Sequence, residues 1–420
     1  MINFEKLQDH VFVTKLAGFE HTKYIQNSET HEKVREDDIP LVQGKNIRNG
    51  FFVNKYEWYI RKETSDLLER SKLNKICILI PYVGSNLGEV GIFYHEYDCH
   101  MASNIAKVEL IDDYFDIEFL KYYLQSDIGQ AYLFQSKQGS AQPNITMKAI
   151  RNTLVVDLDI NLQRKIGRLL KTIDDRIINN QNINVELESM AKTIYDYWFL
   201  QFEFPNEDGK PYKSSGGKMV WSEELKREIP EGWEVGNLYN IADFVNGLAC
   251  QKYRPVDQNR KLPVIKITEM HEGITDSTEY VREDIPEKNI VNDGDILFSW
   301  SATLEIMIWT GGKGGLNQHI FKVIPKEYAK YYVYMQLSAY IVNFVHMAEA
   351  RKTTMGHITM DHLKQSRIAV PPKRIAKIYD EKICGIFNKI ICNNRQNREL
   401  ILLRNFLLPM LLNGQVGFKK

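Results

Sequence analysis

The chain lacks the features that mark membrane proteins, secreted proteins and proteins that coat nucleic acid through bulk charge. No apolar run reaches 18 residues, and the segment from Met1 to Lys6 has no basic stretch followed by an apolar one. Lys and Arg total 54, as do Asp and Glu, so a polyanion would have to be held by local patches. With 420 residues, 44% of them apolar, the sequence predicts a cytoplasmic globular protein of two or three domains.

Cysteine is scarce, and the few cysteines form no CxxC pair. This usage is typical of a reduced intracellular protein. Cys99 and His100 together supply too few ligands for a metal site, so no metal is predicted. The five cysteines are Cys77, Cys99, Cys250, Cys384 and Cys392.

Familiar catalytic motifs are also missing. Gly311–Gly315 and Gly216–Lys218 are glycine-rich turns without the Ser or Thr and the strand–loop–helix context of a phosphate-binding loop. The Pro371-Pro372 pair follows Val370, so it is not part of an Asn/Asp-Pro-Pro-Tyr/Phe motif for methylation of an amino group. The sequence therefore predicts no catalytic residue in this chain.

What is present is an internal repeat. Sliding the sequence by 213 positions places residues 145–187 on 358–400 without a gap, which indicates a duplicated unit. A looser echo lies upstream, where residues 105–108 resemble residues 320–323. The positions of the first copy that meet an identical residue are Ile145, Thr146, Met147, Ile173, Ile177, Ile178, Asn180, Asn184, Glu186 and Leu187.

Each copy is predicted to be a globular mixed α/β piece followed by a long helix. Short apolar runs at 76–80 and 295–298 are typical of strands, and 116–136 and 327–347 are typical of helices. Pro371-Pro372 is expected to start the second long helix and Pro409 to end it. Residues 201–232, rich in Gly, Pro, Ser and Lys, are expected to form an exposed connector.

The two long helices carry matching heptad seams. Apolar residues recur every three or four positions in both, and each seam turns polar at two places, Asn180 and Asn184 in one helix and Asn393 and Asn397 in the other. A single apolar stripe would indicate a helix packed on its own domain, but buried asparagines require hydrogen-bond partners and fix register in coiled coils. An antiparallel pairing would set Asn180 near Asn397 and Asn184 near Asn393, so these four residues are predicted to determine the register.

Seven segments resemble the specificity subunit of type I restriction-modification systems. The resemblance extends over nearly the whole chain, apart from residues 45–75 and 255–293, where the recognition domains of that family vary. The segments are Lys15–Glu20, Met101–Lys107, Phe199–Met219, Ile229–Trp233, Asn246–Pro255, Gly294–Thr303 and Leu316–His319.

The resemblance implies an α/β (mixed α+β) chain with a pseudo-two-fold repeat, in which a long antiparallel two-helix coiled coil separates two target-recognition domains. Residues 1–155 would form the first such domain, 156–200 the first spacer helix, 201–232 the connector, 233–370 the second domain and 371–413 the second spacer helix. It also implies a non-catalytic subunit that binds double-stranded DNA at a bipartite site. Its partners would be two methyltransferase subunits and restriction/translocase subunits. S-adenosylmethionine, ATP and Mg²⁺ would be held by those partners and not by this chain.

Candidate DNA contacts lie in loops that mix positive charge with amide and hydroxyl groups, as phosphate and base-edge contacts require. Trp300 is equally well explained as a core residue, and Asn104 as the cap of a turn. The candidates are Lys45, Asn46, Arg48, Tyr82, Ser85, Asn86, Gln142, Lys252, Tyr253, Arg254, Ser299, Ser301, Thr303, Asn317, Gln318, Thr353 and Thr354.

Two other classes of protein stay open. A self-contained DNA methyltransferase with a divergent catalytic domain would turn over a labelled methyl donor by itself. A coiled-coil DNA-binding regulator would differ in its size under native conditions, with and without a methyltransferase. The DNA sequence that is recognised does not follow from the residues, because base readout depends on side-chain geometry in the variable loops.

Overall fold

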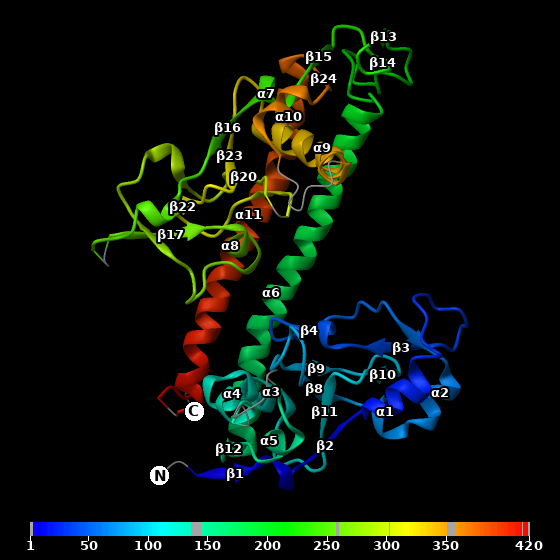
Figure 1. The fold of residues 1–420 in the computed structure, drawn as a ribbon, viewed down its shortest axis with the longest axis vertical. Coiled ribbons are helices and arrows are strands. Elements are labelled where there is room, and N and C mark those ends of the chain that lie inside the picture. Colours follow the sequence, from blue (N-terminus) through cyan, green and yellow to red (C-terminus); the bar gives the residue numbers. More distant parts are fainter. Residues whose placement is uncertain are drawn as a thin grey trace. The chain divides into compact units, whose positions relative to one another are not determined.

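A computed structural model of the chain describes residues 3–135, 144–257, 260–301, 303–350, 358–413 and 415–418. The chain forms two compact units: Met1–Asp175 with Leu400–Lys420, and Arg176–Glu399. We call them unit 1 and unit 2. Helix α6 (Ile160–Tyr195) begins in unit 1 and ends in unit 2, and α11 (Lys373–Leu412) runs from unit 2 into unit 1 (Figure 1). Each unit therefore contains a segment of both long helices.

Unit 1 contains two four-stranded sheets. The first has the order β2-β11-β8-β9 and is antiparallel throughout. The second has the order β6-β3-β10-β7, and its central pair β3–β10 is parallel. The strands are β2 (Val11–Lys15), β3 (Ile39–Val42), β6 (Tyr59–Ile60), β7 (Lys72–Leu73), β8 (Cys77–Pro81), β9 (Gly91–Phe93), β10 (Cys99–Met101) and β11 (Ile105–Leu110).

Strand β8 shows why these residues form the centre of unit 1. Its side chains alternate between the two faces of the sheet. Ile78 and Ile80 join a core with the helices, whereas Cys77 and Leu79 join the core beneath the second sheet. Because both faces are covered, the strand is apolar without alternation, as the run at 76–80 predicts.

Unit 2 repeats this topology strand for strand. Its sheets have the orders β16-β23-β20-β21 and β18-β17-β22-β19, and the central pair β17–β22 is again parallel. The strands are β16 (Ala242–Asn246), β17 (Lys261–Ile265), β18 (Tyr280–Arg282), β19 (Ile290–Val291), β20 (Ile296–Ser299), β21 (Glu305–Ile308), β22 (Gly314–Leu316) and β23 (Ile320–Pro325).

The weak echo between residues 105–108 and 320–323 marks equivalent strands, β11 and β23. Both contain a lysine that crosses to the second sheet. Lys107 Nζ donates to the backbone oxygen of Lys72 at 2.7 Å, and Lys322 Nζ donates to that of Ile290 at 2.9 Å. The predicted fold class, a mixed α/β chain with an internal repeat and paired long helices, is confirmed.

A short two-stranded sheet closes each repeat just before its long helix. In unit 1, β1 (Phe4–Lys6) pairs with β12 (Leu154–Val156), and in unit 2, β15 (Glu234–Gly236) pairs with β24 (Ile368–Val370). The first strand of each repeat therefore meets its last strand. The other short elements are β4 (Ile47–Arg48), β5 (Phe51–Phe52), α1 (Gly18–Glu20), α2 (Lys62–Leu67), α5 (Met147–Arg151), α7 (Leu238–Ile241), α8 (Ile267–Glu272) and α10 (Met360–Gln365).

Three local expectations are corrected. The helix expected over 116–136 is two helices, α3 (Ile117–Gln125) and α4 (Asp127–Leu133), because Ser126 is extended and its hydroxyl caps α4 through the Gly129 amide. Its counterpart α9 (Lys330–Ala350) is continuous. Pro409 lies inside α11 and does not end it, because a proline in the last turn removes only one hydrogen bond before the helix stops at Leu412.

The third correction concerns residues 201–232, which are not simply an exposed connector. Helix α6 ends in a π-helical turn, Asp196–Leu200, after which Phe202 and Phe204 enter the core of unit 2 beside Trp233. A hairpin of β13 (Met219–Ser222) and β14 (Arg227–Pro230) follows. Among the described helices, none has an apolar stretch long enough to cross a bilayer.

Candidate nucleic-acid interface

Two loops of unit 1, residues 43–48 after β3 and 82–88 after β8, are joined by amide side chains. Asn46 Oδ1 accepts from the Gln43 amide at 2.9 Å, and its Nδ2 donates to the backbone oxygens of Val53 and Lys55 at 3.0 and 2.8 Å. Asn46 is 3% exposed. Its amide group is fully used within the protein, so Asn46 is better explained as a loop-stabilising residue than as a DNA contact.

Asn86 plays a similar part between the loops. Its Nδ2 donates to the backbone oxygen of Ile47 at 2.8 Å and to that of Gly44 at 3.3 Å, while its Oδ1 accepts from the Ser85 hydroxyl at 3.0 Å. Asn104, before β11, accepts from the Gly44 amide at 3.2 Å. These contacts hold the two loops together near the carboxyl end of β8.

The side chains that the loops leave accessible are mostly basic. Lys45 and Arg48 are exposed, and Lys45 forms an ion pair with Glu57. The ring of Tyr82 lies 4.6 Å from the ammonium group of Lys15, its hydroxyl donates to the Ser103 backbone oxygen, and burial raises its pKa. Lys15 was not among the predicted contacts. Its place at the end of β2, opposite Ala106 of β11, follows only from the strand register.

Unit 2 also exposes basic side chains, in the segment that follows β16. Lys252 and Arg254 are exposed, and Tyr253 lies between them with its ring 5.5 Å from the guanidinium group of Arg282. Arg282 is a basic residue that sequence reasoning missed, because it is the last residue of β18, in a segment without a recognisable motif. The structure brings these residues together at the 3₁₀ turn Cys250–Lys252.

The loop between β20 and β21 is built around Ser299. Its hydroxyl donates to the backbone oxygens of Ser301 at 3.2 Å and of Thr303 at 2.7 Å, and the residue is fully buried. Ser301 is also buried, whereas the Thr303 side chain is exposed. Of the three predicted contacts in this loop, Thr303 therefore has the side chain that reaches solvent.

A third segment of unit 2, Asn317–His319, lies beside this loop. Asn317 Oδ1 accepts from the His319 amide at 3.3 Å, and Gln318 Nε2 lies 3.3 Å from His319 Nε2. The rings of Trp300 and His319 are 5.6 Å apart. Both amide residues are half-buried, and His319 is exposed.

The segments after β8 in unit 1 and after β20 in unit 2 make equivalent backbone hydrogen bonds. The amide of Tyr82 donates to the backbone oxygen of Asn104 at 3.1 Å, as that of Trp300 donates to His319 at 3.3 Å. The amides of Ile145 and Ile358 then donate to the backbone oxygens of Tyr82 and Trp300, both at 3.0 Å. The same framework thus carries different side chains in the two repeats. The predicted contacts Gln142, Thr353 and Thr354 lie outside the described residues.

The asparagines of the helix seam face one another within unit 2. Asn180 Nδ2 donates to Asn397 Oδ1, and Asn393 Nδ2 donates to Asn184 Oδ1, both at 2.8 Å. All four residues are buried. The antiparallel pairing of α6 and α11 brings these pairs together as the heptad pattern predicts; that they determine the register stays a prediction.

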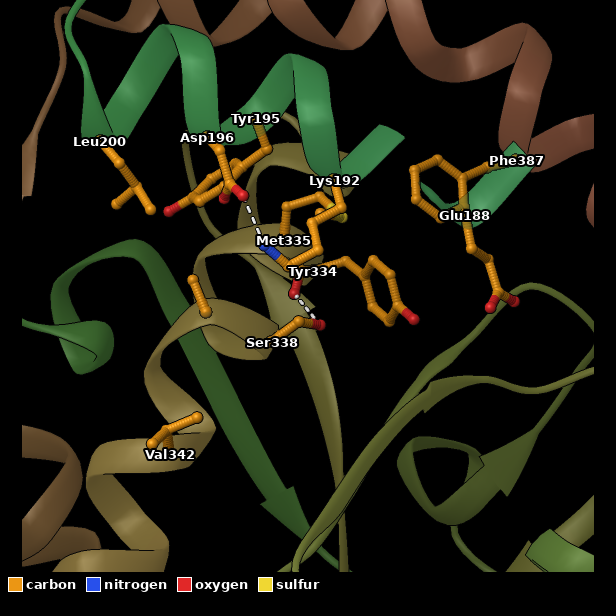
Figure 2. Close-up of a pocket in the computed structure, with 11 residues that line it drawn as sticks. Glu188, Lys192, Tyr195, Asp196, Leu200, Tyr334, Met335, Ser338, Val342 and Phe387 are labelled. Atoms are coloured by element: carbon orange, nitrogen blue, oxygen red, sulfur yellow. Dashed lines mark hydrogen bonds and ion pairs between the residues drawn. The ribbon is translucent and has the colours of Figure 1, made fainter. Parts of the chain in front are cut away.

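A pocket of about 340 Å³ opens between α6 and α9 in unit 2 (Figure 2). Tyr334, Val342 and Phe387 give it apolar walls. Lys192 and Asp196 at its rim pair with each other, and burial raises the pKa of the Glu188 carboxyl.

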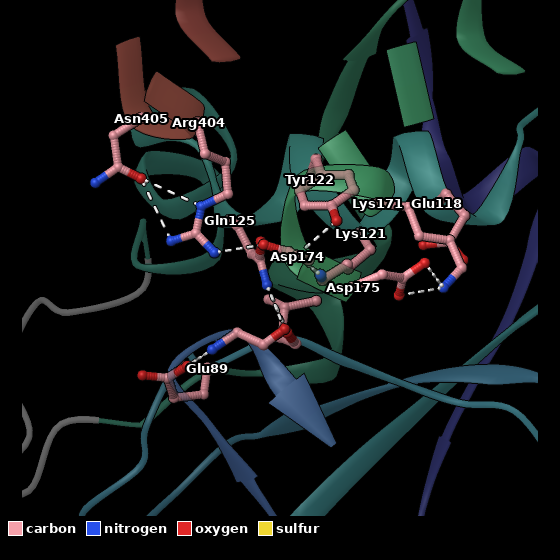
Figure 3. Close-up of polar contacts among 12 residues, drawn as sticks. Glu89, Glu118, Lys121, Tyr122, Gln125, Lys171, Asp174, Asp175, Arg404 and Asn405 are labelled. Carbon is pink, nitrogen blue, oxygen red and sulfur yellow. Dashed lines mark hydrogen bonds and ion pairs between the residues drawn. The ribbon is translucent and has the colours of Figure 1, made fainter. Parts of the chain in front are cut away.

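The equivalent place in unit 1 is occupied by a buried ionic cluster (Figure 3). The 213-residue shift maps Phe387 onto Asp174 and Tyr334 onto Lys121. Asp174 Oδ2 accepts from Lys121 Nζ at 2.8 Å and from the Tyr122 hydroxyl at 2.6 Å, and its Oδ1 accepts from Arg404 Nη1 at 2.8 Å. This carboxylate joins α3, α6 and α11.

Two copies of one mixed α/β fold, each with a partly basic loop surface and each followed by a long helix, define a duplicated recognition protein. Residues 17–189 and 230–401 match the family described as type I restriction modification DNA specificity domain. The chain belongs to this family, the specificity subunits of type I restriction-modification systems. No group of three or more His, Cys, Asp or Glu residues that could hold a metal ion occurs in the part of the chain that the structure describes.

Individual relatives agree with this family assignment. The chain is 24% identical over 320 residues to the type I restriction enzyme MjaIX specificity subunit of Methanocaldococcus jannaschii, which covers 71% of this chain and 69% of that protein. It is 24% identical over 357 residues to the HindI specificity subunit of Haemophilus influenzae, covering 71% and 77%. The fold resembles the S subunit structure from M. genitalium with a TM-score of 0.56, at 14% identity over 98% of this chain and 96% of that one.

Proposed function

We propose that the chain is the non-catalytic subunit of its complex and reads a bipartite DNA site, one half-site per repeat. The observation that carries this proposal is the shared loop framework, Tyr82–Asn104–Ile145 in unit 1 and Trp300–His319–Ile358 in unit 2. Because the backbone framework is shared and the exposed side chains differ, it supports two related recognition domains with different sequence specificities. Phosphate contacts would come from the basic residues and base readout from the polar ones.

Exchange of one recognition domain tests this proposal. Strand β1 pairs with β12, so the exchanged segment should be residues 1–156 rather than a piece that ends before β12. The expected result is that one half of the methylated motif changes while the other half and the gap stay the same. The measurement is methylome sequencing of a host that carries the chimera with its methyltransferase partner. A change in both halves would contradict independent reading.

The same proposal includes docking of methyltransferase subunits, with restriction/translocase subunits joining to form the restricting complex. An exposed apolar face of α11 in unit 1 supports a protein partner there, because Leu402 and Phe406 are each 64% exposed and Leu403 lies beside them. Replacing Leu402 and Phe406 with Glu should abolish co-purification with the methyltransferase and leave the melting temperature unchanged. Lys389→Glu, also exposed on α11, is the matched control.

S-adenosylmethionine, ATP and Mg²⁺ are assigned in this proposal to the partner subunits. The absence of a recognisable catalytic motif supports that assignment. Purified chain incubated with DNA and labelled methyl donor, or with ATP, should show no turnover. Activity that a point substitution in this chain abolishes would overturn the assignment.

A further inference from the structure

A largely buried carboxylate ties the second recognition domain to helix α11. Asp293 lies in the turn before β20, and its side chain is 10% exposed. Its Oδ2 accepts from Arg395 Nε at 2.7 Å, and its Oδ1 lies 3.5 Å from Arg398 Nη1. Arg398 Nη1 also donates to the backbone oxygen of Thr310 at 2.7 Å. Two arginines of one helix thus hold two segments of the domain.

The loop at Thr310 lies against Arg398. Trp309 is buried, and its indole Nε1 donates to the Gly312 backbone oxygen at 2.6 Å, while the Gly312 amide donates to Asp293 Oδ1 at 2.6 Å. Gly312 has a φ of 89°, a conformation that favours glycine. A Cβ atom there would also make a tight contact, 3.3 Å, with Arg398 Nη1.

These contacts fix the root of the β20–β21 hairpin. The amide of Gly294 donates to the backbone oxygen of Trp309 at 2.7 Å, and that of Trp309 donates to Asp295 at 2.8 Å. The opposite end of the hairpin carries Ser299, Ser301 and Thr303. A four-residue strand is about 13 Å long, so a tilt of about 10° at the root would move the tip by roughly 2 Å.

The first repeat is held in a different way. The shift of 213 maps Arg395 and Arg398 onto Asn182 and Val185, neither of which carries a charge. In unit 1 the residue after β9, Tyr94, donates to Glu118 Oε1 at 2.6 Å, and Lys171 Nζ lies 5.2 Å from its ring. The arginine clamp therefore belongs to the second domain.

We propose that Asp293, Arg395 and Arg398 are positioning residues that fix the second recognition domain on α11 and so hold the gap between the two half-sites to one length. The inference rests on the proposed function. Hydrogen bonds between guanidinium groups and a carboxylate are charge-assisted and directional, which suits a joint that must not tilt. The clamp touches no predicted DNA contact and acts through the hairpin.

The test uses the full chain in complex with its methyltransferase subunits. Arg398→Ala and Asp293→Asn are compared with Arg398→Lys and with Lys389→Ala, an exposed α11 residue outside the clamp. The substrates are DNA duplexes in which both native half-sites are separated by the native gap, or by one base pair less or more. In the clamp variants, the preference for the native gap should fall about tenfold, with unchanged half-site sequences. Arg398→Lys should restore part of that preference, and Lys389→Ala should keep all of it.

The possible outcomes distinguish the clamp hypothesis from the proposed function. Native gap preference in a methylating Arg398→Ala and Asp293→Asn complex would overturn the clamp and leave the proposed function standing. Failure of the unaltered complex to require both half-sites would instead overturn the proposed function. Because Asp293→Asn could impair folding, Arg395→Ala is included, since the Arg395 side chain is half exposed. Loss of methylation at every gap in an Arg395→Ala protein that melts normally would also contradict a positioning role.

Discussion

At the scale of single residues, Asp174 pairs with one buried cation, Lys121, and one partly buried cation, Arg404 (Figure 3). Burial by itself would raise the pKa of its carboxyl, but the charges of Lys121 and Arg404 and the hydrogen bonds from Lys121 and Tyr122 lower the pKa below the usual 3.8. Burial lowers the pKa of Lys121, and Asp174 opposes that change. The carboxylate is therefore the centre of this cluster.

Asp174→Asn should lower the free energy of unfolding at pH 7 by about 3–5 kcal/mol, because it leaves the buried Lys121 and the partly buried Arg404 without their anion. Urea denaturation measures the loss. Asp175→Asn is the control, since Asp175 makes an exposed i, i+4 pair with Lys171 and should cost about 0.5 kcal/mol or less. A depressed carboxyl pKa stabilises the protein above the unfolded value of 3.8 and ceases to do so as the pH falls through the folded value. The difference between wild type and Asp174→Asn should therefore shrink below pH 3.8, and equal stability at pH 7 would contradict the assignment.

Two residues of the loop at 43–48 are predicted to have different roles. Arg48 is predicted to contact DNA, and Asn46 is predicted to stabilise the loop. Arg48→Ala should weaken DNA binding and lower the salt dependence by about one counterion without changing the melting temperature. Asn46→Ala should cost about 1–3 kcal/mol of stability, because three partly buried hydrogen bonds to backbone groups are lost. Fluorescence anisotropy over a range of salt concentrations and thermal melting measure the two effects. Lys6→Ala, on β1, is the control; DNA binding that depends on Asn46 but not on Arg48 would reverse the assignment.

At the scale of elements, the helix seam shows what a sequence can predict. The spacing of apolar residues is local, so the two long helices and the facing asparagines follow from the chain itself. The Asp174–Arg404 and Asp293–Arg395 pairs do not, because they join residues 230 and 102 positions apart whose proximity depends on the folded helices. Asn46 and Asn86 look like DNA contacts for the same reason: the backbone groups that they bind are invisible in the sequence. The break at Ser126 likewise depends on a cap formed across the turn.

Replacing Asn180, Asn184, Asn393 and Asn397 with Leu should raise the free energy of unfolding by about 1–2 kcal/mol and loosen the register. Asn180 and Asn393 each leave Oδ1 without a hydrogen bond among the described residues. Replacing these two asparagines should therefore remove little stabilising free energy. Light scattering should show self-association of the leucine variant. The control is Asn182→Leu, an exposed position on α6. A monomeric variant with native helix pairing would show that the asparagines do not set the register.

At the scale of the whole molecule, the paired helices predict how the recognised gap can be changed. An insertion into α6 alone would move Asp174 away from Arg404, so both helices must lengthen together. Seven residues inserted between Asp174 and Asn180, and seven between Asn397 and Arg404, preserve the heptad pattern and add about 10 Å to each helix. The gap should then lengthen by about three base pairs with both half-sites unchanged.

Methylome sequencing of a host that expresses the lengthened chain measures this change. Seven-residue insertion into α6 alone is the comparison, and it should lower stability without producing a new defined gap. If the doubly lengthened, folded and partner-bound protein kept the original gap, the spacing would have to come from the loops or from the methyltransferase subunits.

The pairing of α6 with α11 also has a consequence for synthesis on the ribosome. Asn180 meets Asn397, which is 217 residues later in the chain, and at roughly 5–20 residues per second this takes about 10–40 s. During that interval the seam of α6 in unit 2 has no partner from its own chain, and neighbouring ribosomes hold other copies of the same seam. Unpaired asparagine side chains are well hydrated before α11 is made, whereas an all-leucine seam would bind other exposed apolar surfaces. We therefore expect the polar layers to limit association between nascent chains until α11 is translated.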